Sequence, residues 1–273
     1  MNKNILILGK GFIGERLLKE LDCRICESFI KSFGDAEKVV KKYKPKIIIN
    51  CIGITGKRNV DDCELQKEET LLANSFVPLI LAEVCLRNNI KLVHISSGCI
   101  FNFDYQKDKP IKEESRDYFF GLFYSRSKIY SDLALETLSK KYNILICRIR
   151  IPLLNEPHPR NLLDKLIKYK KVIDIPNSVT YIPDFIRALK HLIKANARGV
   201  YNLVNKGDLR YPRLMSVYQK YIPDFKYEEI NFHKLGLTRT NLLLSTRKLE
   251  KSGFKVRPID SVLEECVREY LKY

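Results

Sequence analysis

Residues 4–21, NILILGKGFIGERLLKEL, run from a short apolar segment through a glycine-rich turn into a helical pattern. Residues 4–8 predict a buried strand, and residues 12–21 repeat apolar side chains at helical spacing. The turn between them permits a tight bend, a close approach of pyrophosphate to the backbone, and close helix packing. It predicts a dinucleotide-binding site formed by Gly9, Lys10, Gly11, Phe12, Ile13 and Gly14.

Strand and helix patterns alternate after this turn. Strands are predicted at 24–26, 47–52, 92–95, 144–149 and 200–204, and helices at 36–43, 68–88, 124–141, 161–170 and 183–194. Short apolar strands separated by helices are typical of a parallel sheet covered on both faces. We therefore expect a doubly wound α/β fold of the Rossmann type. Its NAD(P)-binding domain should comprise residues 1–150, with 180–206 returning to it, and residues 151–179 and 207–273 should form a smaller substrate-binding lobe.

Composition narrows the class of protein. The chain has 273 residues, 45% of them hydrophobic, and 49 Lys and Arg against 32 Asp and Glu give a net charge of +17. The lysines are spread along helices and no nucleic-acid-binding motif occurs, so we expect an anionic small molecule as partner. No uninterrupted apolar run reaches the roughly 18 residues of a membrane span. With no signal peptide evident and cysteines scattered along the chain, we expect a cytoplasmic protein without a membrane partner.

Two further patterns indicate carbonyl reduction. Tyr124 and Lys128 are four residues apart and share one face of a predicted helix. A lysine cation beside a phenol favours phenolate, and such a tyrosine can donate a proton to a carbonyl oxygen during hydride transfer. The segment His94–Phe101, HISSGCIF, places hydroxyls at the carboxyl end of a predicted strand, where ligands bind in parallel sheets.

The glycine turn, Ser97 and the Tyr124–Lys128 pair together resemble extended short-chain dehydrogenase/reductases. The resemblance implies that Ser97 polarises the carbonyl, Tyr124 is the acid, and Lys128 tunes Tyr124 and holds the nicotinamide ribose. Ser97 is preferred to Ser96 because the family places its Ser or Thr four residues before the aromatic that matches Phe101. The turn itself is one residue shorter than the family's usual Gly-x-x-Gly-x-x-Gly.

A longer set of motifs resembles bifunctional nucleotide-rhamnose synthase/epimerase-reductases, with dTDP-4-dehydrorhamnose reductases as wider relatives. The resemblance rests on Thr55–Glu64 (TGKRNVDDCE), Gly98–Phe101, Phe123–Ser125, Pro159–Asn161 and Ile175–Ser178. It implies inversion at C3 and C5 of a nucleotide 4-keto-6-deoxyglucose, followed by reduction at C4. Cys99 would then be the base and Lys165 the opposing acid.

Several other polar residues are candidates for ligand contacts. Asn50 and Gly53 end the strand expected beneath the cofactor, and the predicted substrate contacts are Thr55, Asn74, Ser97, Arg160 and Asn161. Arginine suits a diphosphate through bidentate bonds. Lys10 could meet the 2′-phosphate of NADPH whereas Glu27 would repel it, so these two residues leave the cofactor open. The expected cofactor is NADPH, with NADH as the alternative. No metal is predicted, because metal-ligand spacing is lacking at His94, His158, His191 and His233.

Three functions fit these observations. The first is an NADPH-dependent 3,5-epimerase/4-ketoreductase that forms nucleotide L-rhamnose, with UDP favoured over dTDP because the nearest motifs are those of UDP-sugar enzymes. The second is a monofunctional dTDP-4-dehydrorhamnose reductase supplied by a separate epimerase. The third is a non-catalytic NADP-binding regulatory subunit. A homodimer is expected, since helix-pair dimers are common in this superfamily.

Overall fold

The apolar segment and glycine turn form β1 (Ile5–Leu8) and α1 (Phe12–Glu20) in the computed structural model, which describes residues 4–57, 59–236 and 238–273. The chain forms two compact units. The first unit comprises Met1–Ile100, Tyr118–Arg148 and Ile193–Tyr201, and the second comprises Phe101–Asp117, Ile149–Leu192 and Asn202–Tyr273. The two units are described separately below.

The first unit is built on a six-stranded sheet, in the order β2, β1, β3, β4, β5, β9. Its other strands are β2 (Arg24–Cys26), β3 (Ile47–Asn50), β4 (Lys91–Ser97), β5 (Ile144–Ile149) and β9 (Gly199–Asn202). β1 pairs in parallel with β2 and β3, and β3 with β4. This confirms the predicted doubly wound fold. Because the strand order reverses between β1 and β3, their carboxyl ends flank a crevice suited to a ligand.

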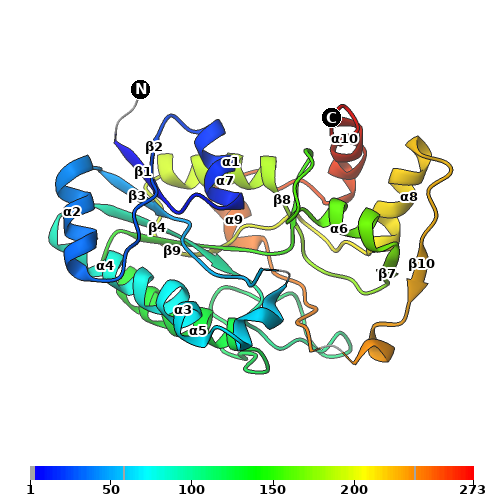
Figure 1. Cartoon of the computed structure of the whole chain (residues 1–273), viewed down its shortest axis with the longest axis horizontal. Helices are drawn as coiled ribbons and strands as arrows, with labels where there is room; N and C mark the ends of the chain where they lie inside the picture. Colours follow the sequence, from blue (N-terminus) through cyan, green and yellow to red (C-terminus); the bar gives the residue numbers. More distant parts are fainter. Residues whose placement is uncertain (1–3, 58, 237) are drawn as a thin grey trace. The chain divides into compact units, whose positions relative to one another are not determined.

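Helices cover both faces of this sheet (Figure 1). α1 packs against β1 and β2, while α4 lies on the opposite face and contacts α2, α5 and β4. The bounds of these helices are α2 (Phe33–Tyr43), α3 (Lys67–Leu71), α4 (Val77–Arg87) and α5 (Phe123–Ser139), with a short 3-10 helix, η1 (Val60–Glu64), before α3. α3 and α4 are joined by one π-helical turn, η2 (Leu72–Phe76), so the helix predicted at 68–88 is interrupted by a wider turn.

The helical run Lys67–Arg87 corrects one expectation. This helical run has 21 residues, and its most apolar 18-residue window has a mean hydropathy of 1.5, so by length and composition it could cross a membrane. The expectation of no such stretch counted only uninterrupted apolar residues, whereas this run also contains polar ones. Its most apolar part is 61% buried inside the structure. Burial against the sheet and its neighbouring helices therefore accounts for the apolar composition of this run.

The strand β9 is held at the sheet edge by a buried lysine at the start of β4. The Nζ of Lys91 donates to Asn143 Oδ1 at 2.6 Å, to Asn196 Oδ1 at 3.2 Å and to the carbonyl of Ala197 at 2.6 Å. These acceptors lie in the loops that precede β5 and β9. The ammonium group of Lys91 therefore links the beginnings of β4, β5 and β9 by hydrogen bonds.

The second unit has a separate apolar core. It contains two small parallel sheets, β6 with β8 and β7 with β10. Its elements are β6 (Pro152–Leu153), α6 (Leu162–Tyr169), β7 (Lys171–Ile173), β8 (Thr180–Tyr181), α7 (Ile182–Lys194, whose last two residues belong to the first unit), α8 (Tyr211–Tyr221), β10 (Glu228–Ile230), the 3-10 helix η3 (Phe232–Leu235), α9 (Arg247–Lys251) and α10 (Asp260–Tyr270). Leucines of α6 and α8 pack with Val262 and Leu263 of α10.

The unit boundaries differ from the predicted domains at two places. Residues 101–117 group with the second unit, because Ile111 pairs with Leu244 and its carbonyl accepts from Asn202 Nδ2 at 3.1 Å. Of the segment 180–206, only Ile193–Tyr201 belongs to the first unit. The start of α7 stays in the second unit because Asp184 is held there.

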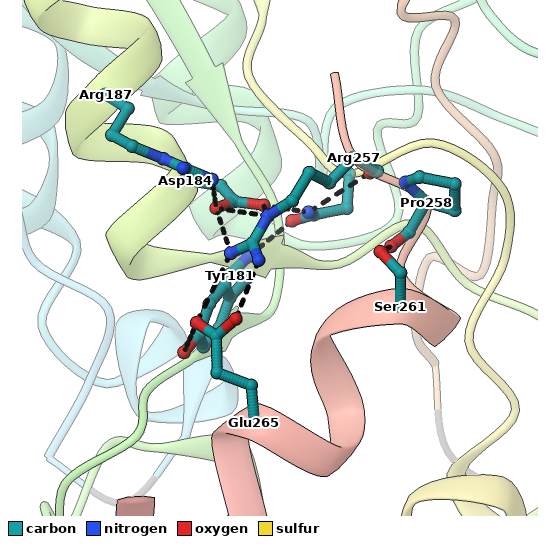
Figure 2. Close-up of polar contacts among 8 residues, drawn as sticks. Tyr181, Asp184, Arg187, Arg257, Pro258, Ser261 and Glu265 are labelled. Carbon is teal, nitrogen blue, oxygen red and sulfur yellow. Dashed lines mark hydrogen bonds and ion pairs between the residues drawn. The ribbon is translucent and has the colours of Figure 1, made fainter. Parts of the chain in front are cut away.

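A network of charged side chains holds Asp184 (Figure 2). Arg257 lies between two carboxylates, donating to Asp184 Oδ2 at 3.0 Å through Nε and to Glu265 Oε2 at 2.7 Å. Asn205 Nδ2 also donates to Asp184, and the hydroxyl of Tyr181 donates to Glu265 at 3.0 Å. Hydrogen bonding to Asp184 raises the pKa of Arg257 above its usual range. The network joins α7 and α10 within the second unit.

Candidate active site

The glycine turn after β1 has the geometry of a pyrophosphate cradle. Gly9 has φ +97°, and a Cβ there would lie 2.8 Å from the nitrogen of Ile52 and 2.9 Å from the carbonyl carbon of Cys51. A Cβ on Gly14 would lie 1.9 Å from the Gly9 oxygen, so the helix packs directly on the turn. Gly11, by contrast, has no atom within 4 Å of such a Cβ and stands at the N-cap of α1. The turn therefore leaves open space at a helix N-terminus, as a bound diphosphate requires.

Two oppositely charged side chains lie near this turn. The Nζ of Lys10 is 3.0 Å from Glu27 Oε1, and both side chains are largely exposed. The hydrogen bond to Glu27 raises the pKa of Lys10 above its ordinary value. In the sequence analysis, Lys10 was expected to attract a 2′-phosphate and Glu27 to repel it. In the structure the two side chains form an ion pair with each other.

The end of β3 carries Asn50 and Gly53. Asn50 is fully buried, and its amide bonds to His94 Nδ1 at 3.1 Å and to the nitrogen of Ile52 at 3.0 Å. Burial keeps the pKa of His94 well below its ordinary value, with the charge of Lys128 acting in the same direction. Asn50 thus shapes the turn after β3. Gly53 is exposed, and a Cβ on it would lie 3.1 Å from Asn74 Oδ1.

Two neighbouring serines end β4 and have different surroundings. Ser96 Oγ donates to Asp132 Oδ1 at 2.8 Å, and Asp132 also accepts from Arg148 Nε at 3.0 Å. Ser97 Oγ instead accepts from the nitrogen of Cys99 at 3.0 Å. A hydroxyl that accepts in this way still carries a hydrogen to donate. Ser96 therefore belongs to a buried ion-pair cluster, whereas Ser97 is oriented by the turn that carries Cys99.

The helix α5 brings Tyr124 and Lys128 to the same part of the unit. Both side chains are buried. Ser125 Oγ donates to the carbonyl of Cys99 at 2.7 Å, which ties the first turn of α5 to the segment after β4. The Nζ of Lys128 reaches the end of β3, because a Cβ on Gly53 would lie 3.0 Å from it. Burial lowers the pKa of Lys128 to about 8, and the nearby Asp132 opposes that shift.

Asn74 lies in the π-helical turn and is fully buried. Its Oδ1 accepts from the nitrogen of Ile54 at 2.9 Å, and its Nδ2 donates to the Ile54 carbonyl at 2.9 Å and to Ser127 Oγ at 3.0 Å. The side-chain amide is therefore occupied in joining the end of β3 to α5. π-Helical turns frequently accompany functional sites. Here the turn directs Asn74 to the backbone of Ile54 and to the hydroxyl of Ser127, which precedes Lys128, and the substrate contact of Asn74 stays a prediction.

The second unit holds the other candidates at the start of α6. Asn161 is fully buried and caps α6 by accepting from the nitrogen of Leu163 at 3.3 Å, while its amide donates to the carbonyl of Leu154 at 2.9 Å and to Asp164 Oδ2 at 2.9 Å. Its side chain thus organises the loop before α6. Arg160 is exposed and Lys165 half-buried. Burial lowers the pKa of Lys165, and the charge of Arg160 adds to the effect.

The motif Thr55–Glu64 also lies in the first unit. Thr55 is half-buried after β3. Arg58 lies outside the described residues, as does the side chain of His233. Within the described part of the chain, no group of three or more His, Cys, Asp and Glu has metal-binding geometry.

Sequence reasoning missed the Asp132–Arg148 pair behind Ser96. Both side chains are fully buried, and Arg148 NH2 also bonds to Asp132 Oδ2. A signal was present, because Arg148 interrupts an otherwise apolar strand, ILICRI. Asp132 also follows Lys128 by one helical turn, on the same face of α5.

The model of the family described as RmlD substrate binding domain matches residues 3–211. The chain belongs to this family. A bifunctional dTDP-4-dehydrorhamnose 3,5-epimerase/dTDP-4-dehydrorhamnose reductase of Arabidopsis thaliana is 32% identical to this RmlD-family chain, over 97% of the chain and 93% of that protein. The chain also matches trifunctional UDP-glucose 4,6-dehydratase/UDP-4-keto-6-deoxy-D-glucose 3,5-epimerase/UDP-4-keto-L-rhamnose-reductases of the same plant, and spans 36% of their length.

Solved structures share the fold of this RmlD-family chain. The L780 UDP-rhamnose synthase of Acanthamoeba polyphaga mimivirus superposes with a TM-score of 0.89 at 26% identity, covering 97% of this chain and 98% of that one. A dTDP-4-dehydrorhamnose reductase of Bacillus anthracis in complex with NADP superposes with a TM-score of 0.81 at 21% identity, covering 100% and 99%. These matches confirm the resemblance drawn from the motifs.

Proposed function

We propose that this chain is an NADPH-dependent reductase that forms nucleotide L-rhamnose from a nucleotide-linked 4-keto-6-deoxy sugar. The observation that carries the proposal is the junction of α5 with the end of β4. Ser125 Oγ donates to the Cys99 carbonyl at 2.7 Å, and this bond supports assigning Ser97 and the Tyr124–Lys128 pair to one site. Relatives named as rhamnose synthases and dTDP-4-dehydrorhamnose reductases support the substrate class.

The cofactor assignment rests on the glycine turn. The close packing at Gly9 and Gly14 and the open space at Gly11 support a dinucleotide-binding turn, and Gly53 is the proposed cofactor contact at the end of β3. The similar reductase of Bacillus anthracis is described with NADP. When bound, NADPH would supply the hydride. Lys10 would meet the 2′-phosphate after exchanging its contact with Glu27, and NADH is the alternative that leaves this pair intact.

In the proposed reduction, the C4 carbonyl carbon receives a hydride and its oxygen receives the proton of Tyr124. Ser97 donates a hydrogen bond to the same oxygen while negative charge develops on it. The Lys128 ammonium stabilises the phenolate that Tyr124 becomes, and solvent then returns the proton. Asn74 and Asn50 would fix the backbone beneath these groups, so they act as positioning residues.

The proposal extends to 3,5-epimerisation. Protons at C3 and C5 are acidic because each carbon adjoins the ketone, and Ser97 and Tyr124 would stabilise the enolate oxygen. Cys99, two residues after Ser97, would remove the proton as thiolate. Lys165 would return a proton, and its burial and the neighbouring Arg160 both favour proton release. Arg160 and Thr55 would contact the substrate, with UDP as the proposed nucleotide.

One incubation tests the whole proposal. The protein is mixed in heavy water with NADPH and UDP-4-keto-6-deoxyglucose, with a parallel dTDP-sugar sample, and the products are read by NMR. We expect rhamnose that carries deuterium at C3 and C5. Reduction without deuterium there would leave the monofunctional reductase, and no conversion of either sugar by the wild type would favour the regulatory subunit.

Two variants assign the residues. Tyr124→Phe should lower reduction by roughly 10²–10⁴-fold, while NADPH still binds. Cys99→Ser should lose the isotope exchange yet still reduce a pre-epimerised sugar. Unchanged reduction by Tyr124→Phe would contradict the assigned acid.

A further inference from the structure

The motif Thr55–Glu64 forms a compact turn that the proposed chemistry leaves unexplained. Gly56 has φ +75°, and a Cβ there would lie 1.8 Å from the carbonyl oxygen of Asn59. The side chain of Asn59 caps η1 by accepting from the nitrogen of Asp61 at 2.9 Å. The glycine and the cap together fix where η1 ends, and η1 ends at Glu64.

Glu64 reaches the N-terminus of α5. Its Oε1 accepts a hydrogen bond from the nitrogen of Phe123 at 2.7 Å. The first nitrogens of a helix have no partner within the helix, and the N-cap residue here, Leu122, has no polar side chain to supply one. A carboxylate from 59 residues earlier in the chain therefore caps α5. Lys67 and Arg126 lie 3.6 Å and 3.8 Å from the same carboxylate.

This cap lies directly beside Tyr124. Phe123 is bound to Glu64, and Ser125 is bound through its hydroxyl to the carbonyl of Cys99. Tyr124 is the residue between these two anchors. The first anchor leads back to the motif and the second to the segment that carries Ser97, so the helical turn that carries Tyr124 is anchored on both sides of this residue.

We propose that Glu64 is a positioning residue for Tyr124, and that the motif Thr55–Glu64 serves to present this carboxylate to α5. The effect on turnover rests on the proposed function, whereas the effect on the helix does not. Loss of a helix cap loosens the first turn, and small displacements of a reacting group lower rates steeply. Binding of the cofactor should be affected less than turnover, because its diphosphate is expected at the glycine turn and only its ribose at Lys128 of α5.

The test compares Glu64→Ala with Glu64→Gln and Glu64→Asp. Glutamine keeps an oxygen acceptor at the same reach, whereas aspartate keeps the charge and is one methylene shorter. Glu83→Ala is the matched control, because Glu83 is an exposed carboxylate of the same unit whose Oε1 pairs with Arg87 at 2.7 Å. Two quantities are measured: amide hydrogen exchange of residues 119–130 and the kcat and KM of NADPH-dependent reduction.

We expect Glu64→Ala to speed exchange at Phe123, Tyr124 and Ser125 by about fivefold or more, and to lower kcat by roughly tenfold or more. The KM for NADPH should rise by a smaller factor than kcat falls, since the glycine turn is untouched and only the ribose contact expected of Lys128 lies on α5. Glu64→Gln should restore both quantities, Glu64→Asp should resemble alanine, and Glu83→Ala should match the wild type.

If Glu64→Ala has the same amide hydrogen exchange and the same kcat as the wild type, the inference is wrong. Equal damage in the alanine and glutamine variants would also overturn it, because charge or general stability would then be responsible. If the wild type reduces no sugar, the proposed function fails and exchange alone decides: faster exchange rescued by glutamine supports the cap, and unchanged exchange overturns it. If Glu64→Ala does not fold, the glutamine–aspartate comparison decides in the same way.

Discussion

Lys128 is the residue whose charge state should control the proposed reduction. Burial lowers its pKa to about 8 from an ordinary value of 10.5. The ammonium form is therefore present at neutral pH and is lost as the pH rises through about 8. Because that form stabilises the Tyr124 phenolate, kcat/KM for reduction should fall above pH 8, and kcat/KM reports ionisations of the free enzyme. A pH profile with a pre-epimerised sugar checks this without involving Cys99 or Lys165.

Lys128→Arg is the matched variant for this prediction. Arginine stays protonated throughout the range, so the alkaline decline near pH 8 should disappear even though the rate itself falls. An unchanged alkaline decline in Lys128→Arg would assign the ionisation to another group.

At the residue scale, the structure shows what the side chains of three predicted ligand contacts are bonded to, while their contacts with a ligand stay predictions. Asn50, Asn74 and Asn161 were expected to touch cofactor or substrate, yet all three are fully buried. Each uses its amide to hold loop backbone. A side-chain amide both donates and accepts hydrogen bonds, so it can bond to a ligand or to the backbone of a loop equally well. Only the fold decides which of the two is within reach.

At the scale of elements, Asn161 anchors α6 and the loop before it. Asn161→Ala removes the N-cap and the bonds to Leu154, Glu156 and Asp164. We expect a loss of about 2–4 kcal/mol in the free energy of unfolding, together with a raised KM for the sugar because Arg160 adjoins this loop. Urea unfolding and initial rates measure the two effects.

Gln219→Ala is the control for that substitution. Gln219 is a half-buried amide of the same unit that makes one backbone bond, to the carbonyl of Phe225 at 2.9 Å. It should cost about 1 kcal/mol and leave the KM unchanged. Equal losses in the two variants would argue against a special role for Asn161.

Lys91 offers a second prediction at this scale. Lys91→Met would leave the oxygens of Asn143, Asn196 and Ala197 without their shared donor. We expect a loss of about 1–3 kcal/mol and faster amide exchange in β9, since β9 is the strand these bonds hold. Lys46→Met, an exposed lysine just before β3, should change neither. Unaltered exchange in β9 of Lys91→Met would disprove the link.

The elements themselves were largely predictable, and the exceptions have physical causes. The apolar patterns placed all six strands of the sheet, because buried strands are short continuous apolar runs. The π-helical turn at Leu72–Phe76 was missed since apolar spacing looks helical on either side of it. The beginning of α2 at Phe33 was also missed, because its first turn owes its stability to a capping box between Ser32 and Asp35.

At the scale of the whole molecule, the charge network around Arg257 should govern the stability of the second unit. Arg257→Leu leaves Asp184 and Glu265 without their common partner. The Arg257 side chain is 27% exposed, so solvent screening reduces the loss, and we expect about 1–3 kcal/mol. Limited proteolysis should then cut first within residues 257–273.

The control for Arg257 lies on the C-terminal helix α10, which follows Arg257 in the chain. Arg268 is exposed and lies 3.7 Å from Glu269. Arg268→Leu should unfold and be cleaved like the wild type. Equal proteolysis of the two variants would show that the network does not hold the C-terminal segment.

The division into units has a consequence for how the chain is synthesised. The polypeptide passes from one unit to the other after residues 100, 117, 148, 192 and 201, so no single cut in the gene separates them. On the ribosome, β9 is completed only at Asn202, when about three quarters of the 273 residues have been made. Until then the nascent sheet exposes the β5 edge, a surface that attracts other unpaired strands. Slow translation before codon 202 should therefore favour aggregation, and rapid translation through it should favour the native fold.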